Sequence, residues 1–206
     1  GAEAEVSITT NEVNFSWLVA NEPAHSLAIG WDMVYTILDF NLITPMTNGH
    51  LHTWDLSING SYKNNGSEII YNVTPAVSVS SNALKNPELI NSESLQLKTG
   101  MVYKKDLHRN YAWVIGFISD HRFGDYRLYP VAGVCWQPEK GWLLQLALPD
   151  FSIRKTLGSG ISLTFYTAPE GNQWRVFSKD RQRNSDLTYS AIVTGITAEW
   201  LITPTI

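Results

Sequence analysis

The chain has 206 residues with 15 Lys or Arg and 19 Asp or Glu, and the resulting net charge of -4 argues against a nucleic-acid partner. Charged residues make up 17% of the chain, against about 25% in ordinary soluble domains, while aromatic residues reach 12%. One cysteine, Cys135, excludes an intrachain disulfide and a metal cluster built from cysteines.

Strands with one apolar face are predicted along most of the chain, which we interpret as a single domain over residues 1–206. In residues 27–37, large apolar side chains such as Trp31 occupy the odd positions. Small or polar side chains such as Asp32 occupy the even positions. Helical periodicity is nearly absent. The same alternation marks residues 52–59, 71–80, 111–120 and 161–166.

Turn residues separate these runs at short intervals, as Asn64-Asn65-Gly66 does. A further turn is predicted at Pro169-Glu170-Gly171-Asn172, and two longer loops over residues 81–94 and 178–186. The spacing predicts about ten to twelve antiparallel strands in up-and-down order, each of the roughly 9–11 residues that cross a membrane at a tilt. No apolar stretch is long enough for a membrane-spanning helix.

Two all-β folds fit this pattern. One is an up-and-down antiparallel β-barrel whose large apolar face points at lipid. The other is a soluble β-sandwich or lipocalin-like barrel whose apolar face points inward. The volume of the side chains favours the membrane barrel. About eight strands already enclose a lumen that side chains fill, so the large apolar side chains of ten or more strands would not fit inside one barrel. The small polar face also lacks the density of Lys and Glu that a soluble surface carries.

Aromatic rings near the strand ends support the membrane alternative, because such rings form girdles at membrane interfaces. These rings are Tyr62, Tyr103, Tyr111, Tyr126, Tyr129, Trp136, Trp142 and Trp200.

The central segment resembles an uncharacterised family of small outer-membrane β-barrel proteins of bacteria. The resemblance lies in Tyr126-Arg127-Leu128-Tyr129-Pro130, Trp142-Leu143-Leu144-Gln145-Leu146 and Leu148-Pro149. It implies a bacterial outer-membrane location, a structural or narrow-channel role without a cofactor, and contacts with membrane lipid or lipopolysaccharide. Such barrels usually end in an aromatic residue, whereas Ile206 ends this chain.

Strand parity places six charged residues on the small polar face, which lines the lumen in the membrane barrel. Buried charges need partners, so we expect these side chains to pair and plug the lumen. The functional alternative is a narrow path for ions or small solutes, whose selectivity the charges set. The residues are Asp32, Asp55, Lys98, Asp120, Arg122 and Glu199.

Other polar residues give weaker signals. His50 and His52 share a strand face, but two imidazoles do not make a metal site, and no metal is predicted. Cys135 has apolar neighbours and is expected to be an inert packed thiol. Arginine forks suit phosphate, so a basic loop is a candidate for contact with lipopolysaccharide phosphates, the alternative being a solvated loop. Its residues are Arg175, Lys179, Arg181 and Arg183.

The chain is not expected to be an enzyme, although two other functions remain as alternatives. A lipid-modifying barrel enzyme needs a paired nucleophile and base. Its candidates are His25 with Ser26, His108, and His121 with Asp120, none in a recognisable catalytic motif. His25 and Ser26 cannot easily pair, because adjacent strand residues point to opposite faces. The other alternative is a soluble periplasmic or secreted protein that holds a small apolar ligand inside its barrel or sandwich.

Overall fold

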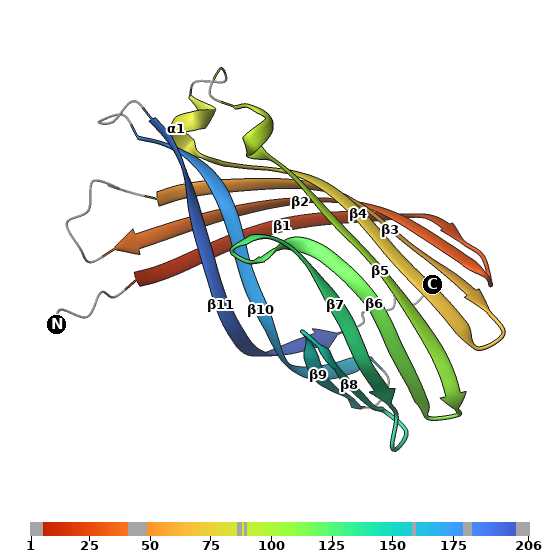
Figure 1. Ribbon diagram of the computed structural model, residues 1–206. Coiled ribbons are helices and arrows are strands. Elements are labelled where there is room, and N and C mark those ends of the chain that lie inside the picture. The colour runs from red at the N-terminus through yellow and green to blue at the C-terminus, as the bar shows by residue number, and fades with distance from the viewer. Residues whose placement is uncertain are drawn as a thin grey trace, which may run out of the picture.

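The chain is almost entirely β-strand in the part that the computed structural model describes, which is residues 6–40, 49–85, 88, 90–157, 160–178 and 183–200. In this part of the chain eleven strands form one sheet in chain order (Figure 1), which confirms the predicted all-β class and up-and-down order. The strands are β1 (Val6–Asn21), β2 (His25–Phe40), β3 (Gly49–Asn64), β4 (Ser67–Ser80), β5 (Leu95–His108), β6 (Tyr111–Phe123), β7 (Asp125–Trp136), β8 (Trp142–Leu148), β9 (Phe151–Leu157), β10 (Ile161–Ser178) and β11 (Arg183–Trp200).

Two short helical elements are described, α1 (Ser81–Leu84) and the 3-10 turn η2 (Ser92–Ser94). Both lie in the predicted loop 81–94 between β4 and β5. None of the described helices has the length and apolar character needed to cross a membrane.

The sheet curls until β10 meets β4, where Arg175 and Val79 form a parallel bridge. The strands from β4 to β10 therefore make a closed barrel of seven strands, while β1 to β3 and β11 extend the sheet beyond it. The predicted barrel is confirmed, but only seven of the eleven described strands form its closed wall. At the crossing, Trp174 of β10 is buried against Leu38 of β2 and Leu51 of β3.

Two details of the wall differ from the sequence predictions. β8 and β9 have 7 residues each, fewer than a membrane-crossing strand was expected to need. β10 continues through the predicted turn at 169–172, because its pairing with β11 runs unbroken there. β9 leaves β10 at Thr167, so Pro169 sits where β10 has a free side, and proline is tolerated at such an edge.

Large apolar side chains point out of the barrel and small polar ones point in. Ile192 is 82% exposed, Leu148 73% and Phe117 43%. On the opposite face, Thr53 and Ser78 are buried. This is the reverse of a water-soluble barrel, and it agrees with the predicted strand parity because neighbouring residues of a strand alternate between faces.

The two ends of the barrel differ in their connections. At one end, here called the short-turn end, hairpins turn at residues 22–24, 65–66, 109–110 and 137–141. Asn65 and Gly66 take φ values of 45° and 73°, the left-handed pair that a tight two-residue hairpin requires. The other end, here called the long-loop end, carries segment 81–94 with α1 and η2.

Candidate functional site

A polar cavity of about 500 Å³ lies inside the wall formed by β2 to β6 and faces Gly171 of β10. Five of the six charges that strand parity places on the inner face line this one cavity: Asp32, Asp55, Lys98, Asp120 and Arg122. Most of the remaining lining is polar, namely Ser57, Asn59, Asn72, Thr74, Thr99 and His121, beside Ile118 and Gly171.

The first charged group in the cavity is built on β2, β3 and β5. Lys98 Nζ lies 2.6 Å from Asp55 Oδ2, and both side chains are largely buried. Asp32 stands opposite Asp55 in the β2–β3 register, so two carboxylates share the site with one ammonium. Like charges directly opposite each other on a sheet repel, and Lys98 offsets this repulsion only for the carboxylate that it contacts. Asp55 Oδ1 has no hydrogen-bond partner among the described residues.

The second charged group ties β6 to β7 and to the β8–β9 turn. Asp120 accepts hydrogen bonds from the Tyr129 hydroxyl at 2.8 Å and from the backbone N–H of Arg122 at 2.9 Å. Arg122 Nε lies 3.1 Å from Asp120 Oδ2, and Arg122 Nη1 donates to both carboxylate oxygens of Asp150 at 3.0 and 3.1 Å. The β6–β7 register shifts after Asp120, and this irregularity lets consecutive residues of β6 join one network.

β10 crosses the barrel towards the long-loop end and is hydrogen-bonded there to β3 and β5. Trp174 Nε1 and Asn172 Nδ2 donate to the same oxygen, Thr53 Oγ1, at 3.1 and 3.0 Å. Gln96 Nε2 donates to the backbone carbonyl of Gln173 at 2.5 Å. A Cβ on Gly171 would lie 2.5 Å from the backbone oxygen of Arg122, so only glycine allows β10 to approach β6 this closely. The sequence did not predict this crossing, and its one local signal is Trp174 among small inner residues.

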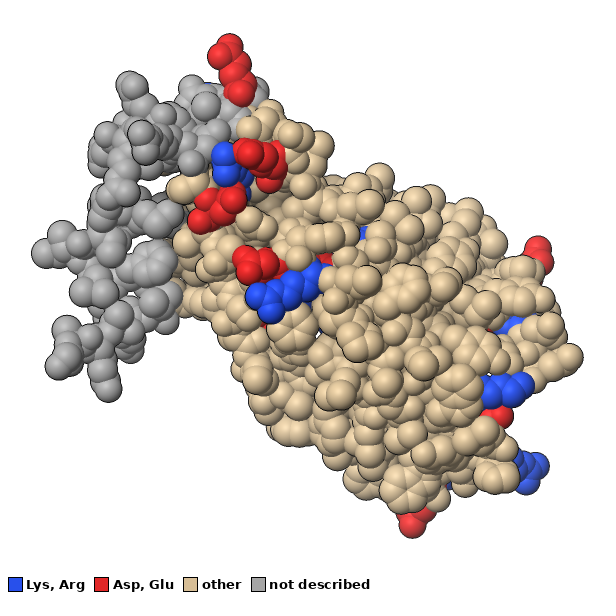
Figure 2. All heavy atoms as spheres, viewed as in Figure 1, with Lys and Arg blue, Asp and Glu red and all other residues tan. Residues whose placement is uncertain are grey.

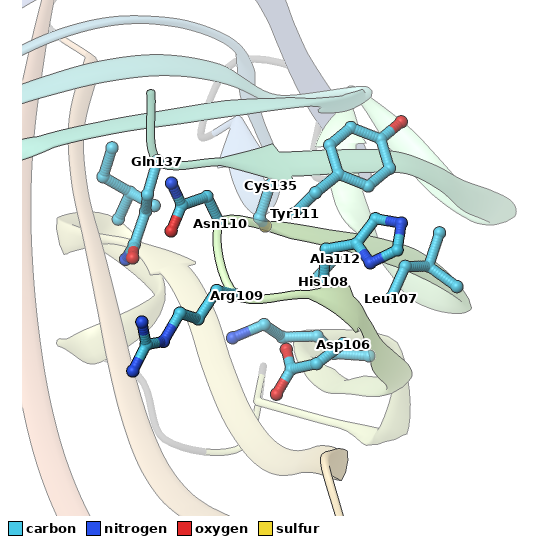
Figure 3. Close-up of a pocket in the computed structure, with 11 residues that line it drawn as sticks. Asp106, Leu107, His108, Arg109, Asn110, Tyr111, Ala112, Cys135 and Gln137 are labelled. Carbon is cyan, nitrogen blue, oxygen red and sulfur yellow. The ribbon is translucent and has the colours of Figure 1, made fainter. Parts of the chain in front are cut away.

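A second polar pocket of about 460 Å³ opens at the short-turn end, around the β5–β6 hairpin (Figure 3). Asp106, Arg109, Asn110 and Gln137 surround it. Half-buried Cys135 also lines this pocket. The main cavity is lined mostly by charged, amide and hydroxyl side chains, whereas Leu107, Ala112 and Leu143 add apolar surface to the short-turn pocket.

Glu199 does not join the other predicted charges. It lies on the inner face of β11 near the short-turn end, where Arg154 Nη2 donates to it at 2.8 Å and Ser162 Oγ at 3.0 Å. Glu199 and Arg154 are both about half exposed. Strand parity thus gives the face of a residue but not its depth along the barrel.

The predicted phosphate-contact loop lies partly outside the described residues. Lys179 and Arg181 are among the residues not described, and so is the side chain of Arg183. Arg175 forms ion pairs with Glu93 and, at 2.8 Å, with Asp186. Its charge is therefore already engaged by two carboxylates.

The two histidines with metal-like spacing make other contacts. His50 Nδ1 is hydrogen-bonded to the Tyr35 hydroxyl, and His52 Nε2 to Ser81 Oγ at 2.8 Å. The His52 ring also stacks on Trp54. Within the described ranges, no three His, Cys, Asp or Glu side chains gather to hold a metal ion.

The histidines considered for catalysis lie at different places in the barrel and contact other residues. Ser26 Oγ bonds Ser61 Oγ at 2.8 Å, while the His25 ring lies against Tyr62. His108 lines the short-turn pocket, and the His121 ring lies against Tyr126. The Ser81–His52 hydrogen bond was not anticipated from the sequence. His52 Nδ1 has no partner in the described part of the chain, so the group that orients the base in a catalytic triad is not seen there.

Comparisons with known proteins identify the family and no activity. No curated protein matches the chain, and no solved structure does either. One family model matches residues 71–206, a span that runs from β4 through β11 and contains most of the cavity. This agrees with the uncharacterised family expected from the central segment. Because the match covers well over half of the chain, the protein belongs to the family described as "Domain of unknown function (DUF6268)".

Proposed function

We propose that this protein is a bacterial outer-membrane β-barrel with a plugged lumen, in a structural or narrow-channel role. The observation that supports this most is the inverted distribution of side chains, with large apolar residues outside and paired charges inside. Apolar patches this extensive are rare on soluble monomers, whereas a bilayer solvates them.

The outer surface has the charge distribution of a membrane-spanning barrel. On the face drawn in Figure 2, charged side chains gather towards the two ends, and the surface between them is almost free of charge. At the short-turn end, Tyr62, Tyr111, Trp136 and Trp200 are exposed. Amphipathic rings at this position fit an interfacial girdle. Tyr129, which the sequence grouped with these rings, instead donates its hydroxyl to Asp120 inside the barrel.

The two ends suggest an orientation in the membrane. Outer-membrane barrels carry short turns on the periplasmic side and longer loops outside. Segment 81–94 would then face the exterior, and the 65–66 turn would face the periplasm. Lipopolysaccharide lies on the exterior side, so any phosphate contact is proposed for the long-loop end. Arg175 is a weak contributor there, because Glu93 and Asp186 already neutralise it.

The soluble alternative needs an apolar interior to hold an apolar ligand. The main cavity is instead lined by carboxylates, an ammonium, a guanidinium and amides. A soluble barrel would also leave residues such as Ile192 in water. The membrane proposal accounts for both faces at once.

The first test is a comparison of refolding with and without detergent. We expect the chain to stay soluble and folded only in detergent or lipid vesicles. Unheated electrophoresis should then show a compact band that shifts on boiling, because closed barrels resist the electrophoresis detergent until they are heated. A monodisperse folded monomer without detergent would contradict the proposal.

The ion pairing predicts a plug. Replacing Asp55 with Asn should reduce stability while leaving the conductance of reconstituted protein close to that of wild type, because β10 still crosses the barrel, held by the Trp174–Thr53 hydrogen bond. Asp125→Asn, at an exposed pair with Arg127, is the matched control for loss of a carboxylate. Urea unfolding measures the change in stability, and recordings in planar bilayers measure the conductance. A large change in ion selectivity with Asp55→Asn alone would favour the channel over the plug.

A further inference from the structure

The wall between β7 and β10 is interrupted over the part nearer the long-loop end. β7 pairs with β8 only from Ala132 to Trp136, and β9 pairs with β10 only from Ile161 to Thr167. Beyond these ladders, β7 from Asp125 to Val131 and β10 over residues 168–174 have no hydrogen-bonded strand on this side in the described part of the chain. Figure 1 shows β8 and β9 as a short hairpin, with β7 and β10 continuing beyond it. This interruption is here called the side window.

Three prolines stand where the short hairpin stops. Pro149 lies in the turn between β8 and β9. Pro130 follows the end of the β7–β8 ladder at Ala132, and Pro169 follows the end of the β9–β10 ladder at Thr167. Proline has no N–H to donate and occurs in sheets mainly at edges. The sequence therefore ends both ladders here and disfavours the addition of another strand at the side window.

Charged groups that point into the barrel are accessible at the side window. The side chains of Arg122 and Asp150 are 39% and 37% exposed, whereas that of Asp120 in the same network is 7% exposed. Arg122 and Gly171 also line the main cavity. The main cavity therefore extends to the edge of the side window.

The outer rim of the side window is apolar. Leu128 of β7 is 69% exposed and Leu148 of β8 is 73% exposed. Tyr126, on the same outer face of β7, is 54% exposed. A molecule at the side window meets apolar side chains outside the barrel and charged side chains inside it. This arrangement suits an amphiphile, whose chain favours apolar surface and whose head needs polar partners.

The charge of the cavity and the side window favours a positively charged head. Four carboxylates face two basic side chains: Asp32, Asp55, Asp120 and Asp150 against Lys98 and Arg122. Asp32 has no hydrogen-bond or ion-pair partner in the described part of the chain. A cleft lined by an excess of one charge concentrates ligands of the opposite charge.

We propose that the side window admits the head of a cationic amphiphile, with an ammonium head and a hydrocarbon chain, from the membrane into the main cavity. The ammonium head pairs with Asp150 at the side window and with Asp32 in the cavity, while the chain stays outside against Leu128 and Leu148. This inference rests on the proposed membrane location. The free backbone groups of β7 and β10 then border a water-filled opening, where such backbone is tolerated at membrane depth.

Electron paramagnetic resonance with two amphiphiles tests this site in vesicles of an uncharged galactolipid. The probes are an alkyl trimethylammonium and an alkyl sulfate with the same nitroxide on the chain, and the fraction immobilised by the protein is measured. We expect the wild-type chain to immobilise several-fold more of the ammonium probe. Asp32→Asn and Asp150→Asn should each at least halve this preference. Asp125→Asn, which removes an exposed carboxylate paired with Arg127, is the matched control and should leave it unchanged.

Asp32→Asn is expected to fold, because it removes a like charge that stands opposite Asp55. The band shift on boiling checks the folding of every variant. Equal immobilisation of both probes by the wild-type chain overturns the proposal, and so does an Asp125→Asn effect as large as those of Asp32→Asn and Asp150→Asn.

The route of entry is tested by relaxation of the nitroxide on the chain of the bound ammonium probe. A chain in the bilayer is relaxed by oxygen, which concentrates in hydrocarbon, and this result supports the side window. Relaxation by a water-soluble nickel complex instead would place the chain in the lumen and overturn the lateral route. A wild-type chain that does not enter vesicles contradicts the membrane proposal, whereas an inserted chain that shows no ammonium preference overturns the side window alone.

Discussion

Replacing Asp120 with Ala is expected to lower the free energy of unfolding by about 1–3 kcal/mol, the cost of leaving a buried hydrogen-bonding group without its partner. The Asp120 side chain is 7% exposed and accepts from the Tyr129 hydroxyl, the Arg122 backbone N–H and the Arg122 guanidinium. Its loss leaves the Tyr129 hydroxyl and Arg122 Nε without their acceptor, while Arg122 Nη1 keeps its hydrogen bonds to Asp150. Urea unfolding followed by tryptophan fluorescence, in the detergent that supports folding, measures the change.

Two matched variants separate the network from the loss of charge alone. Asp125→Ala removes a carboxylate that pairs with Arg127 on the surface, and such exposed pairs contribute about 0–1 kcal/mol. Tyr129→Phe removes one donor to Asp120 and keeps the ring. We expect Asp120→Ala to cost the most, Tyr129→Phe less, and Asp125→Ala least. Equal costs for Asp120→Ala and Asp125→Ala would show that the inner network adds no stability.

The faces of the strands were predictable from sequence because alternation is a local property. A strand that places Trp31 outside must place Asp32 inside, whatever the rest of the chain does. Consecutive antiparallel strands then bring residues of one parity to one face. Asp32, Asp55 and Lys98 therefore share the inner face, as their parity implies, and the structure places all three in one cavity.

The depth of a residue and the path of β10 were not predictable, because both depend on contacts between distant strands. Glu199 has inner parity, yet the β10–β11 register places it beside Ser162 near the short-turn end. Residues 169–172 have the composition of a turn, but pairing with β11 keeps them extended. Local propensity was overridden here by the ladder, as is common in sheets.

The ion-pair partners of the buried charges also depend on contacts between strands that are far apart in the sequence. Asp150 follows β8, and the sequence alone gives no reason to place it beside Arg122 of β6. Because β8 and β9 are short, the turn between them lies beside Arg122, whose guanidinium donates to Asp150. The pairing of inner charges was expected, whereas Tyr129 and Asp150 as partners were not.

Arginine at Phe117 is expected to oppose insertion of the barrel into lipid vesicles by about 2–4 kcal/mol, the cost of this residue on the lipid face at the bilayer midplane. Phe117 points outward from the middle of β6, between Met101 of β5 and Pro130 of β7. Leu107, also exposed, lies near the end of β5, where the same substitution should cost only about 0–1 kcal/mol. Phe117→Leu keeps the site apolar and controls for loss of the ring.

Equilibrium folding into vesicles, measured in urea for all three variants, checks this dependence on depth. The order Phe117→Arg, then Leu107→Arg, then Phe117→Leu, from most to least destabilised, follows from a hydrocarbon layer around β6. In water, both arginines would be solvated at similar cost, and the Phe117→Arg chain would become more soluble without detergent. That result would place the outer apolar face in contact with another protein surface or with water, and the inner charges would then need a different explanation.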